Sequence, residues 1–290
     1  MFVADGRVIF SASDLAAAAR CEYALLRAFD ARLGRGPAVA AEDELLARTA
    51  QLGDEHEQRH LGELRDRTDI TIIGRPSHTV AGLTAAAEAT MRAIERRAPV
   101  IYQAAMFDGR FVGFADFLIL EQDRYRLRDT KLARAVKVEA LLQLAAYADT
   151  LTAAGVPIAP VVELVLGDGA VAEYRADELI PVYRRRRAQL QQLLDRHYAA
   201  GRPVAWEDES VRACLRCPEC AAELRARDDL LLVAGMRIDQ RARLIEAGIG
   251  TVAELAERSE PVAGMSARTF GALHAQARLQ RAPRVDNKPA

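Results

Sequence analysis

The stretch FVGFADFLILEQDRYRLRDTK, residues 111–131, decides the fold expected for this chain. Two runs rich in apolar, β-branched and aromatic residues flank a short polar segment, which is typical of antiparallel strands joined by a tight turn. If the turn is centred between Gln122 and Asp123, then Asp116 and Asp129 lie equally far from the centre and face each other. The sequence therefore predicts two opposed carboxylates on neighbouring strands.

Opposed side chains on paired strands lie roughly 5 Å apart at Cβ. Two carboxylates at that separation raise each other's pKa unless a cation lies between them, and their hard oxygen atoms favour Mg²⁺ or Mn²⁺. The two-residue period of a strand places Lys131 beside Asp129, where a compact ammonium can orient or deprotonate an attacking water. The pattern predicts metal-dependent hydrolysis. A register slip of one residue, or an exposed edge strand, is the alternative.

Outward from this hairpin, hydrophobic periodicity predicts alternating helices and strands. Strands are expected near 8–10, 70–73, 100–107, 110–120, 125–132, 161–166 and 171–175, and helices near 11–29, 41–67, 83–97, 136–153 and 177–200. The fold class is α/β. From 226 to 281 a smaller helical module is expected, whose glycine turn at 245–255 resembles a helix-hairpin-helix that presents amides to phosphate; a helical cap without a ligand is the alternative. Residues 282–290 are expected to be a disordered tail.

Three further polar residues are candidates for the same site. Gln143 and Tyr147 are four residues apart on the expected helix after Lys131, and His56 follows Gly53 on an earlier helix. Each has an ordinary alternative, since such residues are usually surface or satisfied core groups. His60 lies one turn after His56, but no third zinc ligand follows at a suitable spacing.

The four cysteines indicate a second metal site. Cys214, Cys217 and Cys220 are clustered, and Cys21 lies far upstream. Disulfides are disfavoured in a cytosolic protein, so this spacing predicts metal ligation. Four thiolates suit an iron–sulfur cluster or a zinc ion, and unmetallated buried thiols are the remaining alternative.

Composition limits the classes of function. The 290 residues carry a net charge of −1, which argues against a protein that coats nucleic acid generally. DNA contacts would use local arginine patches, Arg184–Arg187 and Arg92, Arg96 and Arg97, although such runs are often only solvated helix faces. No stretch is long and apolar enough for a membrane span, and the start lacks a secretory layout. A cytoplasmic protein without a membrane partner is expected.

The order of these motifs resembles the RecB-like branch of the PD-(D/E)xK nucleases, and more narrowly its iron–sulfur group. That group includes the CRISPR-associated adaptation nuclease and the nuclease domains of AddAB-type helicase–nucleases. The resemblance covers residues 8–222. It implies a restriction-endonuclease-like core, a central mixed sheet flanked by helices, within a domain spanning 1–225. By this resemblance the metal ligands are His56, Asp116, Asp129 and the Thr130 carbonyl. The resemblance also implies that Lys131 is the catalytic lysine and that Gln143 and Tyr147 position the DNA strand. It implies a 4Fe-4S cluster that clasps the core and is held by Cys21, Cys214, Cys217 and Cys220.

The expected function is that of a Mg²⁺- or Mn²⁺-dependent deoxyribonuclease. The resemblance implies an exonuclease acting on single strands or DNA ends in repair, recombination or DNA processing, with a helicase as partner or fusion. Two alternatives differ in class. One is a DNA-end-binding adaptor subunit of a helicase–nuclease assembly, and the other is an RNA-processing nuclease.

Overall fold

The computed structural model describes residues 1–37, 44–206 and 208–281. The chain divides into two compact units, Met1–Ala205 and Trp206–Ala290. The sequence had placed the boundary near residue 225, whereas the structure groups the three-cysteine segment with the second unit. The first unit closes where helix α6 (Ala176–Ala200) ends at Gly201, which has a left-handed φ of 67°. Just beyond it, the Val204 N–H donates to the buried Asp30 at 2.9 Å.

The first unit is built on one mixed sheet of eight strands, as the sequence predicts for its fold class. The strands are β1 (Phe2–Ala4), β2 (Arg7–Ser11), β3 (Ile70–Ile72), β4 (Val100–Phe107), β5 (Phe111–Glu121), β6 (Arg124–Lys131), β7 (Val161–Leu166) and β8 (Val171–Arg175). Strands β4, β5 and β6 are antiparallel neighbours, and β7 pairs parallel to β6. Strand β1, which the sequence analysis did not anticipate, pairs antiparallel with β2.

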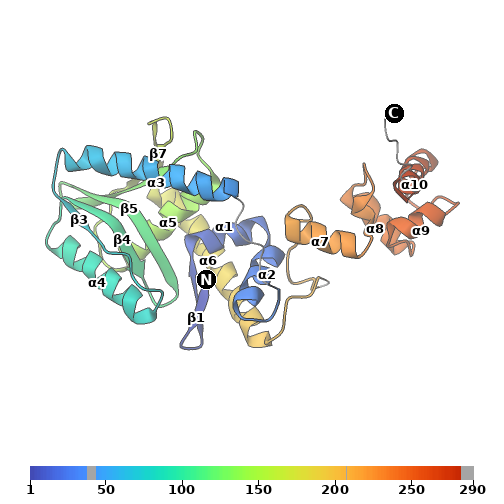
Figure 1. Cartoon of the computed structure of the whole chain (residues 1–290), viewed down its shortest axis with the longest axis horizontal. Helices are drawn as coiled ribbons and strands as arrows, with labels where there is room; N and C mark the ends of the chain where they lie inside the picture. The colour runs from blue at the N-terminus through green and yellow to red at the C-terminus, as the bar shows by residue number, and fades with distance from the viewer. Residues whose placement is uncertain (38–43, 207, 282–290) are drawn as a thin grey trace. The chain divides into compact units, whose positions relative to one another are not determined.

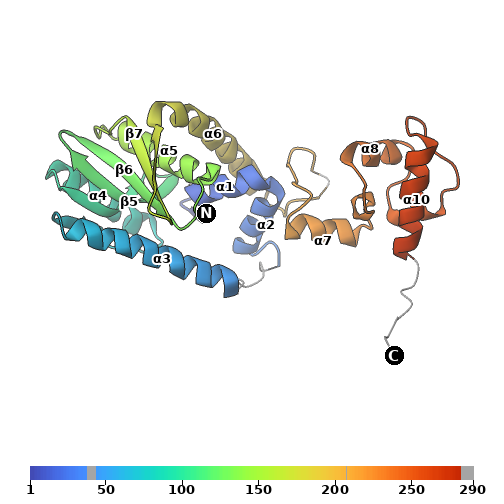
Figure 2. The same cartoon turned by 90° about the horizontal axis from the view of Figure 1, so that it is seen from above.

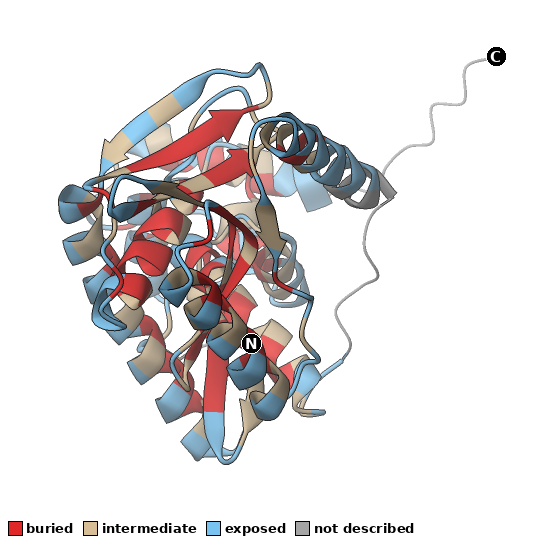
Figure 3. Cartoon of the chain, turned by 90° about the vertical axis from the view of Figure 1, so that its left-hand side faces the viewer, coloured by how far each residue is buried: buried red, intermediate tan, exposed pale blue. Residues whose placement is uncertain are grey.

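Helices cover both sides of this sheet. Helix α3 (Glu44–Arg65) runs along one side of the strands, and α5 (Val138–Ala153) and α6 run along the other side (Figures 1 and 2). Helix α4 (Val80–Glu95) packs against β4. Buried residues gather on the strands and on the helix faces turned toward them, while the outer helix faces are exposed (Figure 3). The start expected for the second helix, near residue 41, lies outside the described residues.

The first expected helix is divided into two. Helix α1 (Ala12–Arg20) and helix α2 (Glu22–Arg32) meet at Cys21, which is extended, with φ −162° and ψ 110°. Cys21 ends the first helix and caps the second, because its Sγ accepts a hydrogen bond from the Ala24 N–H at 3.4 Å. Periodicity alone does not reveal this break, since the apolar pattern continues across it. The break holds the buried Cys21 thiol at a junction between helices rather than within a continuous helix.

Strand β5 changes partners along one of its edges. Strand β4 pairs with it from Val112 to Ile119. On the opposite edge, β2 pairs with residues 111–112 and β6 pairs with residues 117–121. Residues 113–116 therefore lie where β2 and β6 diverge, and the sheet opens beside Asp116. Such a fork leaves polar main-chain and side-chain groups free to make contacts other than ladder hydrogen bonds.

The second unit is helical and has an apolar core of its own, which includes Leu244, Leu255 and Phe270. Its elements are α7 (Pro218–Ala226), the 3-10 turn η1 (Leu230–Leu232), α8 (Ile238–Glu246), α9 (Val252–Glu257) and α10 (Ala267–Arg281). In the glycine turn between α8 and α9, the Gly250 and Thr251 N–H groups both donate to the Glu254 carboxylate, at 2.7 and 3.0 Å. The amides expected to face a phosphate are thus already bonded within the turn, which favours the helical-cap alternative. The expected disordered tail, 282–290, lies outside the described residues.

Among the helices that the structure describes, none has the length and apolar character needed to cross a membrane.

Candidate functional site

The hairpin at the fork has the register that the sequence predicts. Phe117 pairs with Arg128, and the pairing continues to Glu121 and Arg124. The ladder between β5 and β6 ends before Asp116, and on the other edge of β6 Asp129 pairs with Leu164 of β7. In place of the next ladder bond, the N–H and Oγ1 of Thr130 donate to Asp116 Oδ2 at 2.7 and 2.8 Å. The two aspartates still lie at the same point of the sheet, held by side-chain contacts.

Lys131 lies beside Asp129, and its Nζ donates to Asp129 Oδ2. The Asp129 side chain is fully buried, whereas about a third of the Lys131 side chain (34%) is exposed. The other carboxylate oxygen, Oδ1 of Asp129, is buried and has no hydrogen-bond partner; the same is true of Nε2 of His56 on α3. Buried polar atoms are nearly always paired in folded proteins, so these two orphaned atoms require an explanation.

The charges at the fork perturb one another. Burial raises the pKa of Asp116 well above its ordinary value, and the charges of Asp129 and Glu57 raise it further. Burial lowers the pKa of Lys131, but Asp129 and Asp116 outweigh this effect, so that the lysine pKa is raised overall. A carboxyl with a raised pKa beside a charged lysine is typical of sites built for catalysis or cation binding.

Helix α5 brings Gln143 and Tyr147 to the same place. Gln143 Nε2 donates to the Tyr147 hydroxyl at 2.7 Å. Tyr147 is 4% exposed. Burial raises its pKa well above the ordinary value, and the charges of Asp129 and Asp116 add to this. Gly113 of β5 makes room for the tyrosine ring, since a Cβ at that position would overlap the ring. The glycine that begins the Gly113-Phe-Ala-Asp116 motif thus has a packing role.

Two residues that the sequence analysis did not single out complete the cluster. Glu57 follows His56 on α3, and its Oε1 accepts hydrogen bonds from the Tyr102 hydroxyl at 2.6 Å and from Gln103 Nε2. Gln103 Nε2 is also 3.4 Å from Asp116 Oδ1. Gln103 has a left-handed φ of 54°, a backbone conformation that is costly for a residue with a side chain. One signal was available in the sequence: Gln103 is the only polar residue in the apolar run VIYQAAMF of β4, apart from the tyrosine.

His60 does not act with His56 as a zinc pair. Its Nδ1 is 3.3 Å from Glu63 Oε2, and its Nε2 is 3.3 Å from an Arg128 nitrogen. The ring packs edge-on against Phe117 at a centroid distance of 5.1 Å. Both ring nitrogens are therefore engaged by neighbouring residues.

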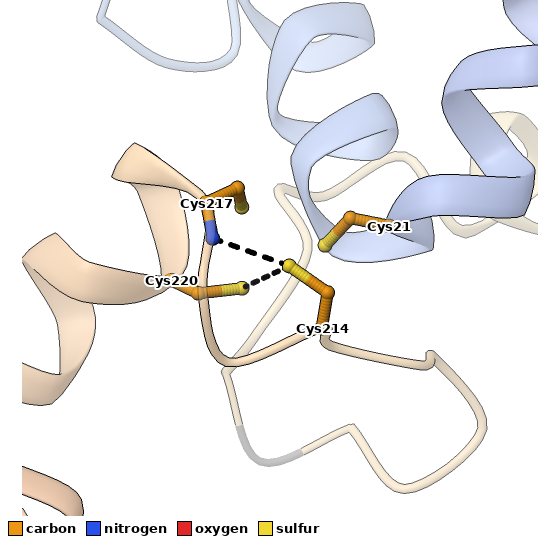
Figure 4. Close-up of side chains that lie close together, drawn as sticks. All are labelled: Cys21, Cys214, Cys217 and Cys220. Carbon is orange, nitrogen blue, oxygen red and sulfur yellow. Dashed lines mark hydrogen bonds between the residues drawn. The ribbon is translucent and has the colours of Figure 1, made fainter.

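The cysteines form the one group, among the described residues, in which three or more His, Cys, Asp or Glu side chains are close enough to share an ion as they stand. The sulfur atoms of Cys21, Cys214, Cys217 and Cys220 all lie within 4.8 Å of one another (Figure 4). His56, Asp116 and Asp129 are not such a group. Among these three residues, Asp129 and His56 each have one buried atom without a hydrogen-bond partner.

The cysteine segment is ordered around its sulfurs. The Cys217 and Arg216 N–H groups donate to Cys214 Sγ at 3.3 and 3.4 Å. The sulfurs of Cys214 and Cys220 are 3.9 Å apart. Two thiolates bound to one tetrahedral zinc, at about 2.3 Å each, are separated by about 3.8 Å. The four cysteines can hold a metal ion or an iron–sulfur cluster.

Most of the expected arginine patches are occupied by contacts within the chain. Arg184 pairs with Asp149, and Arg187 pairs with Asp108 and lies over the rings of Phe10 and Phe111. Arg92 pairs with Glu88, Arg97 pairs with Asp123, and Arg96 donates to the Arg92 carbonyl. Of these patches, Arg185 and Arg186 remain as exposed side chains without a described partner.

Comparison with protein-family models and with curated proteins found no match for this chain.

Proposed function

We propose that this protein is a metal-dependent DNA nuclease whose active site lies at the fork of β5 and β6. The observation that carries the proposal is that Asp129 Oδ1, beside Lys131, is buried without a hydrogen-bond partner, as is Nε2 of His56 on α3. Structural ion pairs rarely leave acceptor atoms unsatisfied in a protein interior. A cation bound at Asp129 would satisfy its unpaired oxygen and would relieve the repulsion between the two aspartates.

In this proposal His56, Asp116 and Asp129 hold one or two Mg²⁺ or Mn²⁺ ions, with the Thr130 carbonyl as a further ligand. When bound, the metal supplies a polarised phosphate and a water of lowered pKa. The hydrogen bonds from Thr130 fix the orientation of Asp116, as outer partners of metal ligands commonly do. Thr130 therefore has a supporting role through its N–H and hydroxyl groups.

Lys131 positions the attacking water in line with the scissile phosphodiester and compensates the negative charge that grows on the phosphoryl oxygens. Its raised pKa keeps it protonated in the metal-free protein, so its role there is that of a charged donor. Tyr147 is likewise kept in its neutral phenol form by burial. Tyr147 and Gln143 would contact the substrate strand beside the scissile bond.

DNA contacts outside the site would come from cations near it. Arg134 and Lys137 are exposed in the segment between Lys131 and α5, and neither side chain has a described partner. We propose that they bind the phosphate backbone, which is how proteins gain affinity without reading sequence. Single strands or DNA ends, degraded exonucleolytically, are the substrate class that the resemblance to RecB-like nucleases implies. A helicase partner remains part of that proposal.

Metal analysis distinguishes two candidate occupants of the site formed by the four cysteines. The resemblance implies a 4Fe-4S cluster, whereas the 3.9 Å sulfur spacing suits a zinc ion. Protein purified without oxygen would be brown and contain about four irons per chain in the first case. It would be colourless and contain one zinc per chain in the second case. A preparation without either metal would contradict both assignments.

The proposed function is tested by incubating the purified chain with end-labelled single-stranded DNA, duplex DNA and RNA of one sequence, in Mn²⁺, Mg²⁺ or EDTA. Metal-dependent cleavage of DNA is expected, and its ladder of products would separate exonuclease from endonuclease action. Preferential cleavage of RNA would contradict the proposal of a DNA nuclease and favour an RNA-processing nuclease. Binding to DNA ends without cleavage by metal-loaded protein would contradict the nuclease proposal and favour the adaptor subunit.

A further inference from the structure

A cavity of about 590 Å³ lies in the first unit beside the fork. Strand β3, the segment that follows it, helix α4 and strand β4 form its wall. Glu57 and Gln103, the two residues that connect α3 and β4 to Asp116, also line it. The cavity therefore begins one side chain away from a proposed metal ligand, and its volume is in the range of pockets that bind small ligands, about 300–1,000 Å³.

The lining combines flat apolar surface with hydrogen-bonding groups. Ile73 and Leu83 are buried aliphatic residues of the lining, and two aromatic residues, Tyr102 and Phe114, also line the cavity. The polar end is formed by Glu57, whose Oε1 is bonded to Tyr102 and Gln103 while its Oε2 has no described partner. Flat apolar walls with a few acceptors are what a nucleobase requires, since its faces stack and its amino groups donate.

The lining of the cavity also includes exposed basic residues. Arg75 and His78 are exposed in the segment between β3 and α4, and no contact to another described residue is recorded for either. Arg75 could reach a phosphate attached to a nucleoside in the cavity, as arginine commonly does at phosphate sites. Asp54 also lines the cavity and would repel a phosphate placed near it, so the phosphate is expected on the Arg75 side.

Hydrogen bonds and close packing within the chain hold the wall of the cavity. Ile73 N–H donates to the Tyr102 carbonyl at 3.0 Å. Thr79 caps α4 by accepting from the Gly82 N–H at 3.1 Å, and its hydroxyl is 3.0 Å from that of Ser77. A side chain at Gly82 would overlap the Ser77 main chain, so the segment packs tightly against the helix. A cavity with a fixed wall binds its ligand without the cost of ordering a loop.

We infer that this cavity is a binding site for one unpaired nucleotide of the substrate strand, close to the scissile phosphate. The inference rests on the proposed function for the choice of ligand. It adds the requirement that one base of the substrate strand be unpaired, which the catalytic residues do not impose. A base can enter a side pocket only when it is unpaired and unstacked from its neighbours. Single strands and frayed ends satisfy this condition, and intact duplex does not.

The test measures binding rather than cleavage. A fluorescein-labelled single-stranded oligonucleotide is titrated with the full chain in EDTA, and a single abasic position is moved along the oligonucleotide. Binding is expected to weaken about tenfold when the abasic position falls at one register, because loss of one stacked base has an effect of this order. A uniform response at every position would overturn the inference.

Two variants with matched controls locate the effect. Ile72→Ser changes an apolar residue of the lining that is 52% exposed, and Val171→Ser on β8, 50% exposed, is its control. Arg75→Ala should weaken binding and reduce the salt dependence by about one phosphate contact, while Arg7→Ala, at an exposed arginine of β2 outside the lining, should do neither. The inference would be overturned if the abasic position weakened binding to Ile72→Ser and Arg75→Ala as much as it weakens binding to the wild type. It would also be overturned if duplex DNA bound as tightly as the single strand.

Binding is measured in EDTA, where no metal-dependent cleavage takes place. Failure of the nucleotide site can therefore be distinguished from failure of the nuclease proposal. Base-dependent binding by a protein that never cleaves DNA would support the nucleotide site and contradict the nuclease. Metal-dependent cleavage without any base-dependent binding would support the nuclease and contradict the nucleotide site.

Discussion

Thr130 donates two hydrogen bonds to one oxygen of Asp116, one from its N–H at 2.7 Å and one from its hydroxyl at 2.8 Å. Asp116 belongs to β5 and Thr130 to β6, at the point where the ladder between these strands has ended. The contact thus replaces strand pairing at the fork. It holds a buried carboxyl, whose pKa is raised by burial and by neighbouring acids, in a fixed orientation.

Replacing Thr130 by Val keeps the shape and the main-chain donor but removes the hydroxyl. Because a hydrogen bond to a buried carboxyl typically contributes about 1–2 kcal/mol, Thr130→Val should lower the free energy of unfolding by that amount in EDTA. Urea denaturation followed by circular dichroism measures it. Thr152→Val, at an exposed position of α5, is the control and should change stability little. An unchanged denaturation midpoint in Thr130→Val would contradict the role assigned to the hydroxyl.

Divalent metal should stabilise the protein through Asp129. Ligands that bind only the folded state raise its stability by mass action, by about 2.7 kcal/mol at a hundred times the dissociation constant. Mn²⁺ should therefore raise the melting temperature of the wild type, and Asp129→Asn should abolish the increase. Asp66→Asn, at an exposed position just after α3, should respond like the wild type. Equal responses of all three proteins in differential scanning calorimetry would place the metal elsewhere.

Gly113 is predicted to tolerate no side chain. A Cβ there would overlap the ring of Tyr147, which is buried and bonded to Gln143, so Gly113→Ala should cost about 1–3 kcal/mol. Tyr147→Leu combined with Gly113→Ala should recover part of this loss, as a double-mutant cycle would show. Gly62→Ala, an exposed position inside α3 with open space around it, should instead be neutral or stabilising by up to about 1 kcal/mol. A neutral Gly113→Ala would contradict the packing described here.

Stability should depend on pH through His60. Burial lowers the pKa of His60 below its ordinary value of 6.5, and the nearby Arg128 lowers it further. The neutral imidazole is therefore favoured in the folded state. The contribution of the neutral imidazole to the free energy of unfolding is fully present above pH 6.5, the pKa of histidine in the unfolded chain. It is lost as the pH falls from 6.5 to the lower pKa of His60 in the folded state. The free energy of unfolding should decline over that interval, by at most about 1.4 kcal/mol per pH unit for one proton.

The variant His60→Gln isolates this group, because glutamine retains an acceptor for Arg128 and does not titrate. The decline of stability below pH 6.5 should be shallower in His60→Gln than in the wild type. His78→Gln, an exposed histidine, should leave the slope unchanged. Identical slopes in all three proteins would show that His60 is not responsible.

Much of the fold was accessible from the sequence because the strands carry clear signals. The bounds of β4, β7 and β8 were predicted as observed, and the hairpin register followed from the turn between Gln122 and Asp123. The helix break at Cys21 was missed because the apolar pattern runs through it. Strand β1 was missed because three residues next to the N-terminus carry too little pattern to be recognised.

The candidate site was accessible only where it follows local geometry. The contact between Lys131 and Asp129, and that between Gln143 and Tyr147, follow from strand and helix periods. Glu57 and Gln103 do not, because they meet Asp116 through long-range packing of α3 against the sheet and through an unusual backbone angle. The nucleotide cavity depends on the same packing. Tertiary contacts of this kind leave no periodic trace in a sequence.

The most direct test of the nuclease proposal compares the rate at which excess protein degrades an end-labelled single strand in Mn²⁺ for three proteins. These are the wild type, Lys131→Ala, and Lys137→Ala as a matched lysine control. Because Lys131 is assigned to charge compensation at the phosphate, its removal should slow cleavage on the order of 100-fold or more. Lys137→Ala should change the rate only through weaker DNA binding, which excess protein overcomes. Cleavage by Lys131→Ala at the wild-type rate would contradict the account.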